Sequence, residues 1–170
     1  YAERYAALVS STQLTCLHFM DCAMPHNVVY HMFSMTHHFC TLQNLRIGLT
    51  DAFWNNVEFV GWALRKGALH RVVSRCPNLV ELELYNALDP DYSSDVTALE
   101  QLTGLSKLAL VGDCVKDDSI TSLTQLGLPA LRDLEIVSSI LDPHTAHIRV
   151  PPSPHGVLQL RKMTQLTQLV

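Results

Sequence analysis

One hexapeptide pattern recurs along this chain: leucine, two variable residues, leucine, one variable residue, and a large apolar residue. Successive copies begin at Leu14, Leu42, Leu79, Leu105, Leu131 and Leu166, and the last copy meets the end of the sequence. The first leucines are 28, 37, 26, 26 and 35 residues apart. A repeat of this length predicts a stack of similar structural units instead of a globule around one central pocket.

The segments between the hexapeptides show helical periodicity. Apolar residues about three positions apart predict helices that include 57–73, 99–102 and 120–126. The acidic pair Asp117-Asp118 is typical of the start of the last of these helices. A strand followed by a helix in each unit predicts an α/β protein.

Alternation along each strand predicts which side chains lie on the face of the sheet away from the helices. In the repeat register, three columns of side chains form on this open face. The first is Cys16, Asn44, Glu81, Lys107 and Asp133, in which the charges alternate and can pair laterally. The second is His18, Arg46, Glu83, Ala109 and Glu135, in which Arg46 can neutralise Glu83. The third is Met20, Gly48, Tyr85, Val111 and Val137. This third, apolar strip either contacts a partner or is covered by the loops that follow the strands.

The long intervals predict insertions near residues 51–63 and 140–156. The second contains Asp142-Pro143-His144 and the extended, proline-rich stretch 150–154, and is expected to be a loop. Such a loop either docks in an aromatic-lined groove or, as we favour, closes a longer repeat. Residues 88–95 are also expected to be a loop. Its aspartates, Asp89, Asp91 and Asp95, lack the glycine and distal glutamate of a calcium-binding EF-hand loop.

The pattern resembles the leucine-rich-repeat family from about Leu8 to Val170. The joint Cys76-Pro77-Asn78-Leu79 resembles its strand-plus-helix type, which includes ribonuclease-inhibitor-like and cysteine-containing repeats. Of the positions where the family usually has Asn or Cys, only Cys22 matches. The resemblance implies an α/β solenoid of five to six repeats, with parallel strands on the concave face and helices on the convex face. Residues 1–170 would form a single segment, and because polar capping repeats are missing, we expect an interior fragment of a longer protein.

This resemblance implies a non-catalytic scaffold that binds a partner protein within a larger assembly. The alternative is a substrate-recognition subunit of a ubiquitin ligase whose F-box lies outside this segment. The candidate partner-binding residues come from the second and third columns: Met20, Tyr85, Val111, Val137, Glu83 and Glu135.

Composition and missing motifs exclude other classes. A net charge of −4 without a basic stripe argues against nucleic-acid binding, and no apolar run approaches the ~18 residues of a membrane span. No nucleophile elbow, phosphate-binding loop or His-Glu-x-x-His motif is present, so we expect neither an enzyme, nor a cofactor, nor a small-molecule substrate. Five widely spaced cysteines do not form a disulfide framework, which indicates an intracellular, cytoplasmic protein.

A cluster of zinc-type side chains requires separate consideration. Eight histidines and cysteines lie within 25 positions: Cys16, His18, Cys22, His26, His31, His37, His38 and Cys40. Their spacing does not fit a structural zinc site. The register also disperses them, with Cys16 and His18 on the open face and Cys22 pointing into the core. We therefore predict no metal site, although His37, His38 and Cys40 are close enough in sequence to contribute to one.

Overall fold

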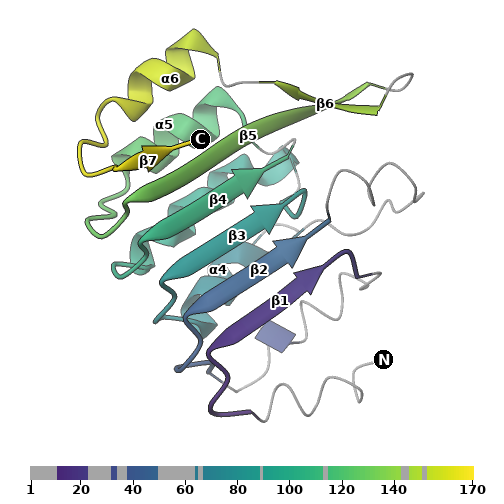
Figure 1. Ribbon diagram of the computed structural model, residues 1–170, viewed down its shortest axis with the longest axis vertical. Helices are drawn as coiled ribbons and strands as arrows, with labels where there is room; N and C mark the ends of the chain where they lie inside the picture. Colours follow the sequence, from purple (N-terminus) through teal and green to yellow (C-terminus); the bar gives the residue numbers. More distant parts are fainter. Residues whose placement is uncertain are drawn as a thin grey trace.

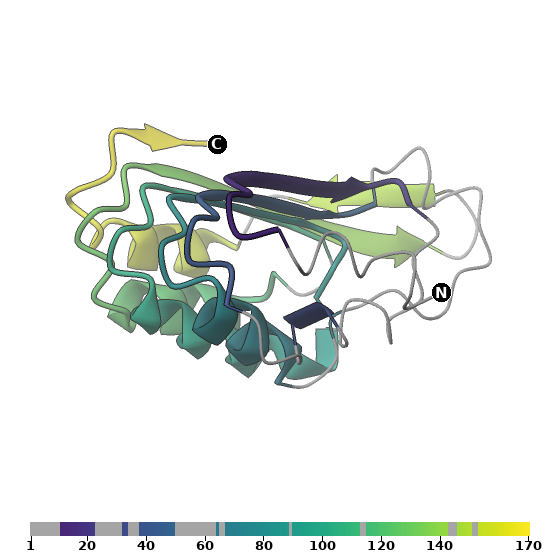
Figure 2. The ribbon, with the colours of Figure 1, turned by 90° about the horizontal axis from the view of Figure 1, so that it is seen from below.

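A computed structural model describes residues 11–22, 32–33, 38–49, 64, 67–88, 90–112, 115–142, 146–150 and 153–170. The chain is an α/β protein, as predicted, with a sheet on one side and helices on the other (Figures 1 and 2). The strands are β1 (Cys16–Met20), β2 (Asn44–Gly48), β3 (Glu81–Tyr85), β4 (Lys107–Val111), β5 (Asp133–Asp142), β6 (Ala146–Val150) and β7 (Gln168–Leu169). The helices are α4 (Ala68–Arg75), the 3-10 helix η1 (Pro90–Gln101), α5 (Asp117–Gln125) and α6 (Pro154–Leu160).

Strands β1 to β6 follow one another in space in their sequence order, and β1 to β5 are parallel. The second leucines of the hexapeptides are direct partners, and so are the members of each predicted column. β7 also joins β5 in parallel, with Leu169 opposite Leu134, as expected of a sixth copy. The predicted register is therefore confirmed for all described copies.

The steps between the parallel strands, from β1 to β5 and from β5 to β7, are all built in the same way at the strand entries. The carbonyl of Thr15, just before β1, accepts the N–H groups of Gln43 and Asn44 at 2.8 and 3.0 Å. At the other end of the sheet the carbonyl of Arg132 accepts from Thr167 and Gln168 at the same two distances. The three intervening steps repeat this double contact, which locks each unit to the next.

A further apolar position, absent from the predicted pattern, lies three residues before the first leucine of the second to sixth hexapeptides. From the second copy onward the leucine N–H donates to the carbonyl of that residue, closing a turn. The side chains at this position are all buried: Phe39, Cys76, Leu102, Leu128 and Met163. The turn thus directs one more apolar group per unit into the core.

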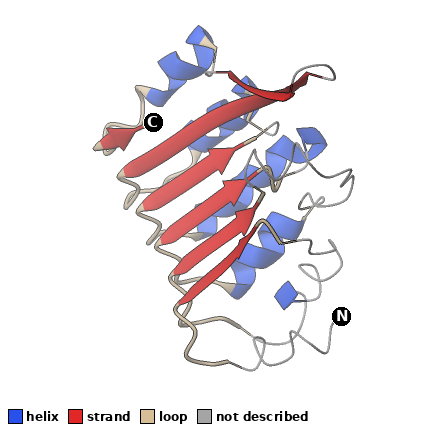
Figure 3. Cartoon of the chain, turned by 45° about the vertical axis from the view of Figure 1, so that its right-hand side comes forward, coloured by secondary structure: helices blue, strands red, loops and turns tan. Residues whose placement is uncertain are grey.

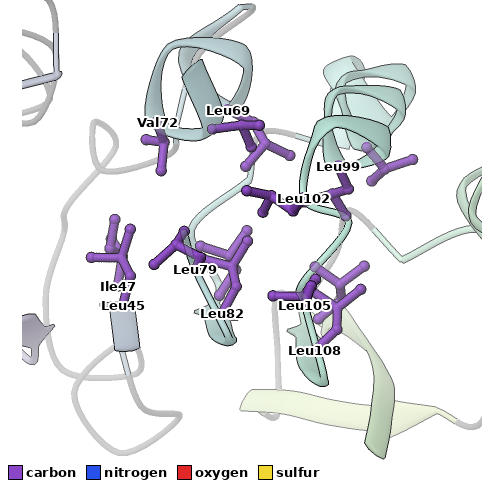
Figure 4. Packing of buried hydrophobic residues seen from close by; sticks show 14 of the residues in the cluster. Leu45, Ile47, Leu69, Val72, Leu79, Leu82, Leu99, Leu102, Leu105 and Leu108 are labelled. Atoms are coloured by element: carbon purple, nitrogen blue, oxygen red, sulfur yellow. The ribbon is translucent and has the colours of Figure 1, made fainter. Parts of the chain in front are cut away.

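The core lies between the sheet and the helices. Inward side chains of the strands, such as Leu82 and Leu108, face apolar residues of α4 and η1, such as Leu69 and Leu99 (Figure 4). Burial of these side chains is the main stabilising contribution, at roughly 1.5–3 kcal/mol for each large aliphatic side chain.

The predicted helices are confirmed in part. α5 begins at Asp117, and its Ile120 and Leu123 are buried. The predicted helix over 57–73 is wrong at its centre, because Leu64 forms a β-bridge with Leu88 and Gly67 is left-handed (φ 75°), so α4 begins at Ala68. The insertion near 51–63 lies outside the described residues.

The two predicted loops are also corrected. Within 88–95, η1 begins at Pro90, and the Asp95 carboxylate accepts the Gly67 N–H at 2.6 Å, which joins η1 to the start of α4. Within 140–156, β5 continues to Asp142 and pairs antiparallel with β6. α6 follows, and Ser153 caps it by accepting the Gly156 N–H at 3.1 Å.

In the described ranges, none of the helices combines the length and the apolar character needed to cross a lipid bilayer.

Candidate functional site

The candidate site is the open face of the sheet, which the helices leave uncovered (Figure 3). Alternation places the variable hexapeptide residues here, as predicted, while the leucines point toward the helices. The five parallel strands β1 to β5 therefore present a broad surface of fixed side-chain positions.

Glu83 of β3 is the centre of a charged cluster on this face. Its carboxylate accepts a hydrogen bond from Nη2 of Arg46 of β2 to Oε1 at 2.9 Å, and Arg46 Nε forms an ion pair with Oε2 at 2.6 Å. Lys107 of β4 donates to Oε1 at 2.7 Å, and the Tyr85 hydroxyl donates to Oε2 at 3.3 Å. The Glu83 side chain is only 3% exposed, whereas Arg46 and Lys107 keep 39% and 37% of their side-chain surface exposed. The cluster ties three neighbouring strands together.

The predicted pairing of Arg46 with Glu83 is confirmed, but the predicted pairing of Lys107 with Glu81 or Asp133 is wrong. Lys107 was expected to pair within its own column, with Glu81 or Asp133. It reaches diagonally to Glu83 instead, because parallel neighbours offset by two residues lie within reach of a lysine side chain. Glu81 and Asp133 are left partly exposed without an ion pair to Lys107.

The cluster controls the ionisation of its members. Burial alone would raise the pKa of Glu83, but hydrogen bonds from Arg46 and Lys107 outweigh it, so the pKa is lowered from its ordinary 4.5. The hydrogen bond to Glu83 raises the pKa of both Arg46 and Lys107. Burial, followed by the charges of Glu83 and Glu135, raises the pKa of Tyr85 to about 12. Tyr85 is therefore neutral at physiological pH and can act as a hydrogen-bond donor.

We expect Glu83→Gln to lower the free energy of unfolding by about 1–3 kcal/mol at pH 7, because it weakens charge-assisted hydrogen bonds. The folded-state pKa of Glu83 is below its ordinary value, so its stabilising effect is present above pH 4.5 and is lost as the pH falls through the folded pKa. Urea denaturation from pH 7 to pH 3 should therefore show the two proteins converging in stability. Glu135→Gln, a partly exposed control on β5, should change stability by less than about 0.5 kcal/mol. Equal effects of the two variants would contradict this role of Glu83.

The apolar strip is only partly available. Met20, Tyr85 and Val137 are half-buried on β1, β3 and β5. Val111 is only 1% exposed, which fits the alternative in which the strip is covered. Tyr85 and Val137 flank it on the neighbouring strands. Among the six predicted contact residues, Met20, Tyr85, Val137 and Glu135 retain exposed surface, while Val111 and Glu83 are buried.

The cysteine and histidine predictions have mixed outcomes. Cys16 and His18 lie on the open face, as expected, and their Sγ and Nε2 atoms are 3.2 Å apart. Cys22 is exposed and donates to the Met20 carbonyl, so the prediction that it points into the core is wrong. Within the described parts of the chain, no three His, Cys, Asp or Glu side chains gather closely enough to hold a metal ion. His37 lies outside these parts, and Cys40 is exposed.

A scan against models of known protein families gave no match to this chain, and a search among curated proteins gave none either. The role of the protein must therefore be inferred from its own residues.

Proposed function

We propose that this chain is a segment of a leucine-rich-repeat solenoid that acts as a non-catalytic scaffold and binds a partner protein on the open face of its sheet. The observation that carries this proposal is the unshifted parallel register of five strands. Such a register repeats the same three outward positions on every strand, which is how repeat proteins build extended binding surfaces. The same turn, with its buried apolar residue, precedes β2, β3, β4, β5 and β7 and further supports a repeat architecture.

The shape and chemistry of the face favour a protein over a small molecule. A shallow, open hollow lies between β1, β2 and β3, lined in part by His18, Asn44 and Glu81. Small ligands are usually held in deeper, mainly apolar clefts. The most buried polar group, Glu83, is satisfied by Arg46 and Lys107 and is not available as an acid or base. These features fit a non-catalytic surface with a wide contact area.

The charge of the open face indicates the charge of the groups that the partner presents to it. The open-face positions of β1 to β5 include two cations, Arg46 and Lys107, and both bind Glu83. Three further carboxylates, Glu81, Asp133 and Glu135, remain partly exposed and give the face an acidic excess. We propose that the partner places basic groups over these carboxylates and apolar groups on Tyr85 and Val137, since complementary charge favours association and orientation.

We also propose that the protein works in the cytoplasm. Three of its described cysteines, Cys16, Cys22 and Cys40, are free and exposed. Free surface thiols are typical of compartments in which glutathione keeps cysteines reduced.

The proposal predicts that Glu135→Lys weakens capture of the partner several-fold, because it places a positive charge where the partner brings its own. The measurement is affinity purification of the tagged chain from cells, with quantitative mass spectrometry of the bound proteins. Glu100→Lys is the matched control, because Glu100 is exposed on η1 in the helical layer. A partner that is lost with Glu135→Lys and retained with Glu100→Lys supports the proposal. Partners that respond equally to both variants would place binding elsewhere.

A further inference from the structure

Cys16 and His18 form a pair that neither the ion cluster nor the core uses. They are separated by one residue on β1, so strand alternation directs both side chains to the open face. Cys16 Sγ and His18 Nε2 are 3.2 Å apart, which is hydrogen-bond distance for sulfur. Both residues are exposed, and β1 is at the end of the described strand order (Figure 1). A reagent can therefore approach the sulfur from solvent.

We propose that Cys16 is a thiol modification site that reacts with small-molecule disulfides and that His18 assists by accepting the thiol proton. The thiolate is the reactive form of cysteine, and a thiol of ordinary pKa, ~8.5, is only a few per cent ionised at pH 7. An imidazole nitrogen at hydrogen-bond distance from the sulfur is placed to accept the proton as the sulfur attacks. This inference does not depend on the proposed partner-binding function.

The reaction is a thiol–disulfide exchange. The Cys16 proton moves to Nε2 of His18, and the resulting thiolate attacks one sulfur of glutathione disulfide. A new S–S bond forms between Cys16 and that glutathione, the original S–S bond breaks, and the other glutathione leaves as a thiolate. It then takes up a proton from the His18 imidazolium or from water. The Cys16 sulfur is oxidised, and one half of the reagent is reduced to glutathione.

The surroundings of His18 provide room for the incoming group. His18 borders the shallow hollow between β1, β2 and β3, which Asn44 and Glu81 also line.

The other described cysteines are internal controls for the reactivity of Cys16. Cys22 is exposed, but its thiol donates to the Met20 carbonyl at 3.2 Å, a group that cannot act as a base toward the thiol. Cys40 is exposed, and among the described residues no hydrogen bond joins its thiol to a histidine. Cys76 is buried, and burial raises its pKa to about 12, which makes it unreactive at neutral pH. Exposure alone thus predicts similar rates for Cys16, Cys22 and Cys40, whereas the pairing predicts a faster Cys16.

The test uses the full chain, reduced and then treated at pH 7 with iodoacetamide or glutathione disulfide, with peptide mass spectrometry to follow each cysteine separately. Cys16 should react roughly tenfold faster than Cys22 and Cys40 with both reagents. His18→Asn should remove this difference without changing the rates at Cys22 and Cys40. His18→Gln serves as a second variant, and circular dichroism checks that each variant is folded. The proposal is overturned if Cys16 reacts no faster than the other two, or if both variants retain its rate.

Discussion

Replacing Leu108 with alanine is expected to lower the free energy of unfolding by about 2–5 kcal/mol. Leu108 is the second leucine of its hexapeptide and lies on β4, with Leu82 and Leu134 as its strand partners. It is fully buried in the core between the sheet and the helices (Figure 4). Truncation leaves a cavity that the rigid neighbouring strands cannot close, so the lost transfer energy and the cavity both contribute. Chemical denaturation followed by circular dichroism measures the difference.

Leu169→Ala is the matched control for this prediction. Leu169 occupies the same hexapeptide position in β7, opposite Leu134, but it is 51% exposed. The same chemical change should therefore cost less than about 1 kcal/mol. If the two substitutions had equal costs, the repeat pattern alone, and not burial in this core, would determine their effect.

The register of the sheet was predictable because two constraints agree. The leucines of each copy must face the helices, and a shift of one residue would turn all of them to solvent. The 26-residue intervals around β4 then leave one arrangement, in which Leu82, Leu108 and Leu134 are direct partners. The same register correctly predicts that Arg46 lies opposite Glu83 and forms an ion pair with it.

Other features depend on side-chain distances and burial, which the strand register does not specify. The choice of Lys107 between Glu81 and Glu83 rests on the reach of a flexible side chain and on the burial of Glu83. The burial of Val111 depends on how its neighbours cover the ends of the strands, which alternation does not describe. The hairpin of β5 and β6 was missed because its proline-rich flanks suggested a loop, whereas a local pairing of Ser138 to Asp142 with 146–150 satisfies the backbone there.

The position of Gly48 leads to the second large expected effect. Gly48 ends β2 on the apolar strip, opposite Tyr85, and has a φ of 149°. A Cβ atom at this position would lie 1.9 Å from the Tyr85 carbonyl oxygen. That oxygen also accepts the Leu49 N–H at 2.9 Å, so it cannot move aside without losing a backbone hydrogen bond. Glycine is therefore required for β2 and β3 to approach each other at this end.

We expect Gly48→Ala to lower the free energy of unfolding by at least about 3 kcal/mol, through steric overlap with the backbone and an unfavourable φ. Gly104→Ala is the control, because nothing lies within 4 Å of a Cβ atom at Gly104. There the substitution should be neutral or should stabilise the fold by up to about 1 kcal/mol, since alanine restricts the unfolded chain. Urea denaturation of both variants measures the contrast. If Gly48→Ala and Gly104→Ala had similar stabilities, β2 and β3 would not approach closely at Gly48. Met20 and Tyr85 would then occupy other positions on the open face than those described.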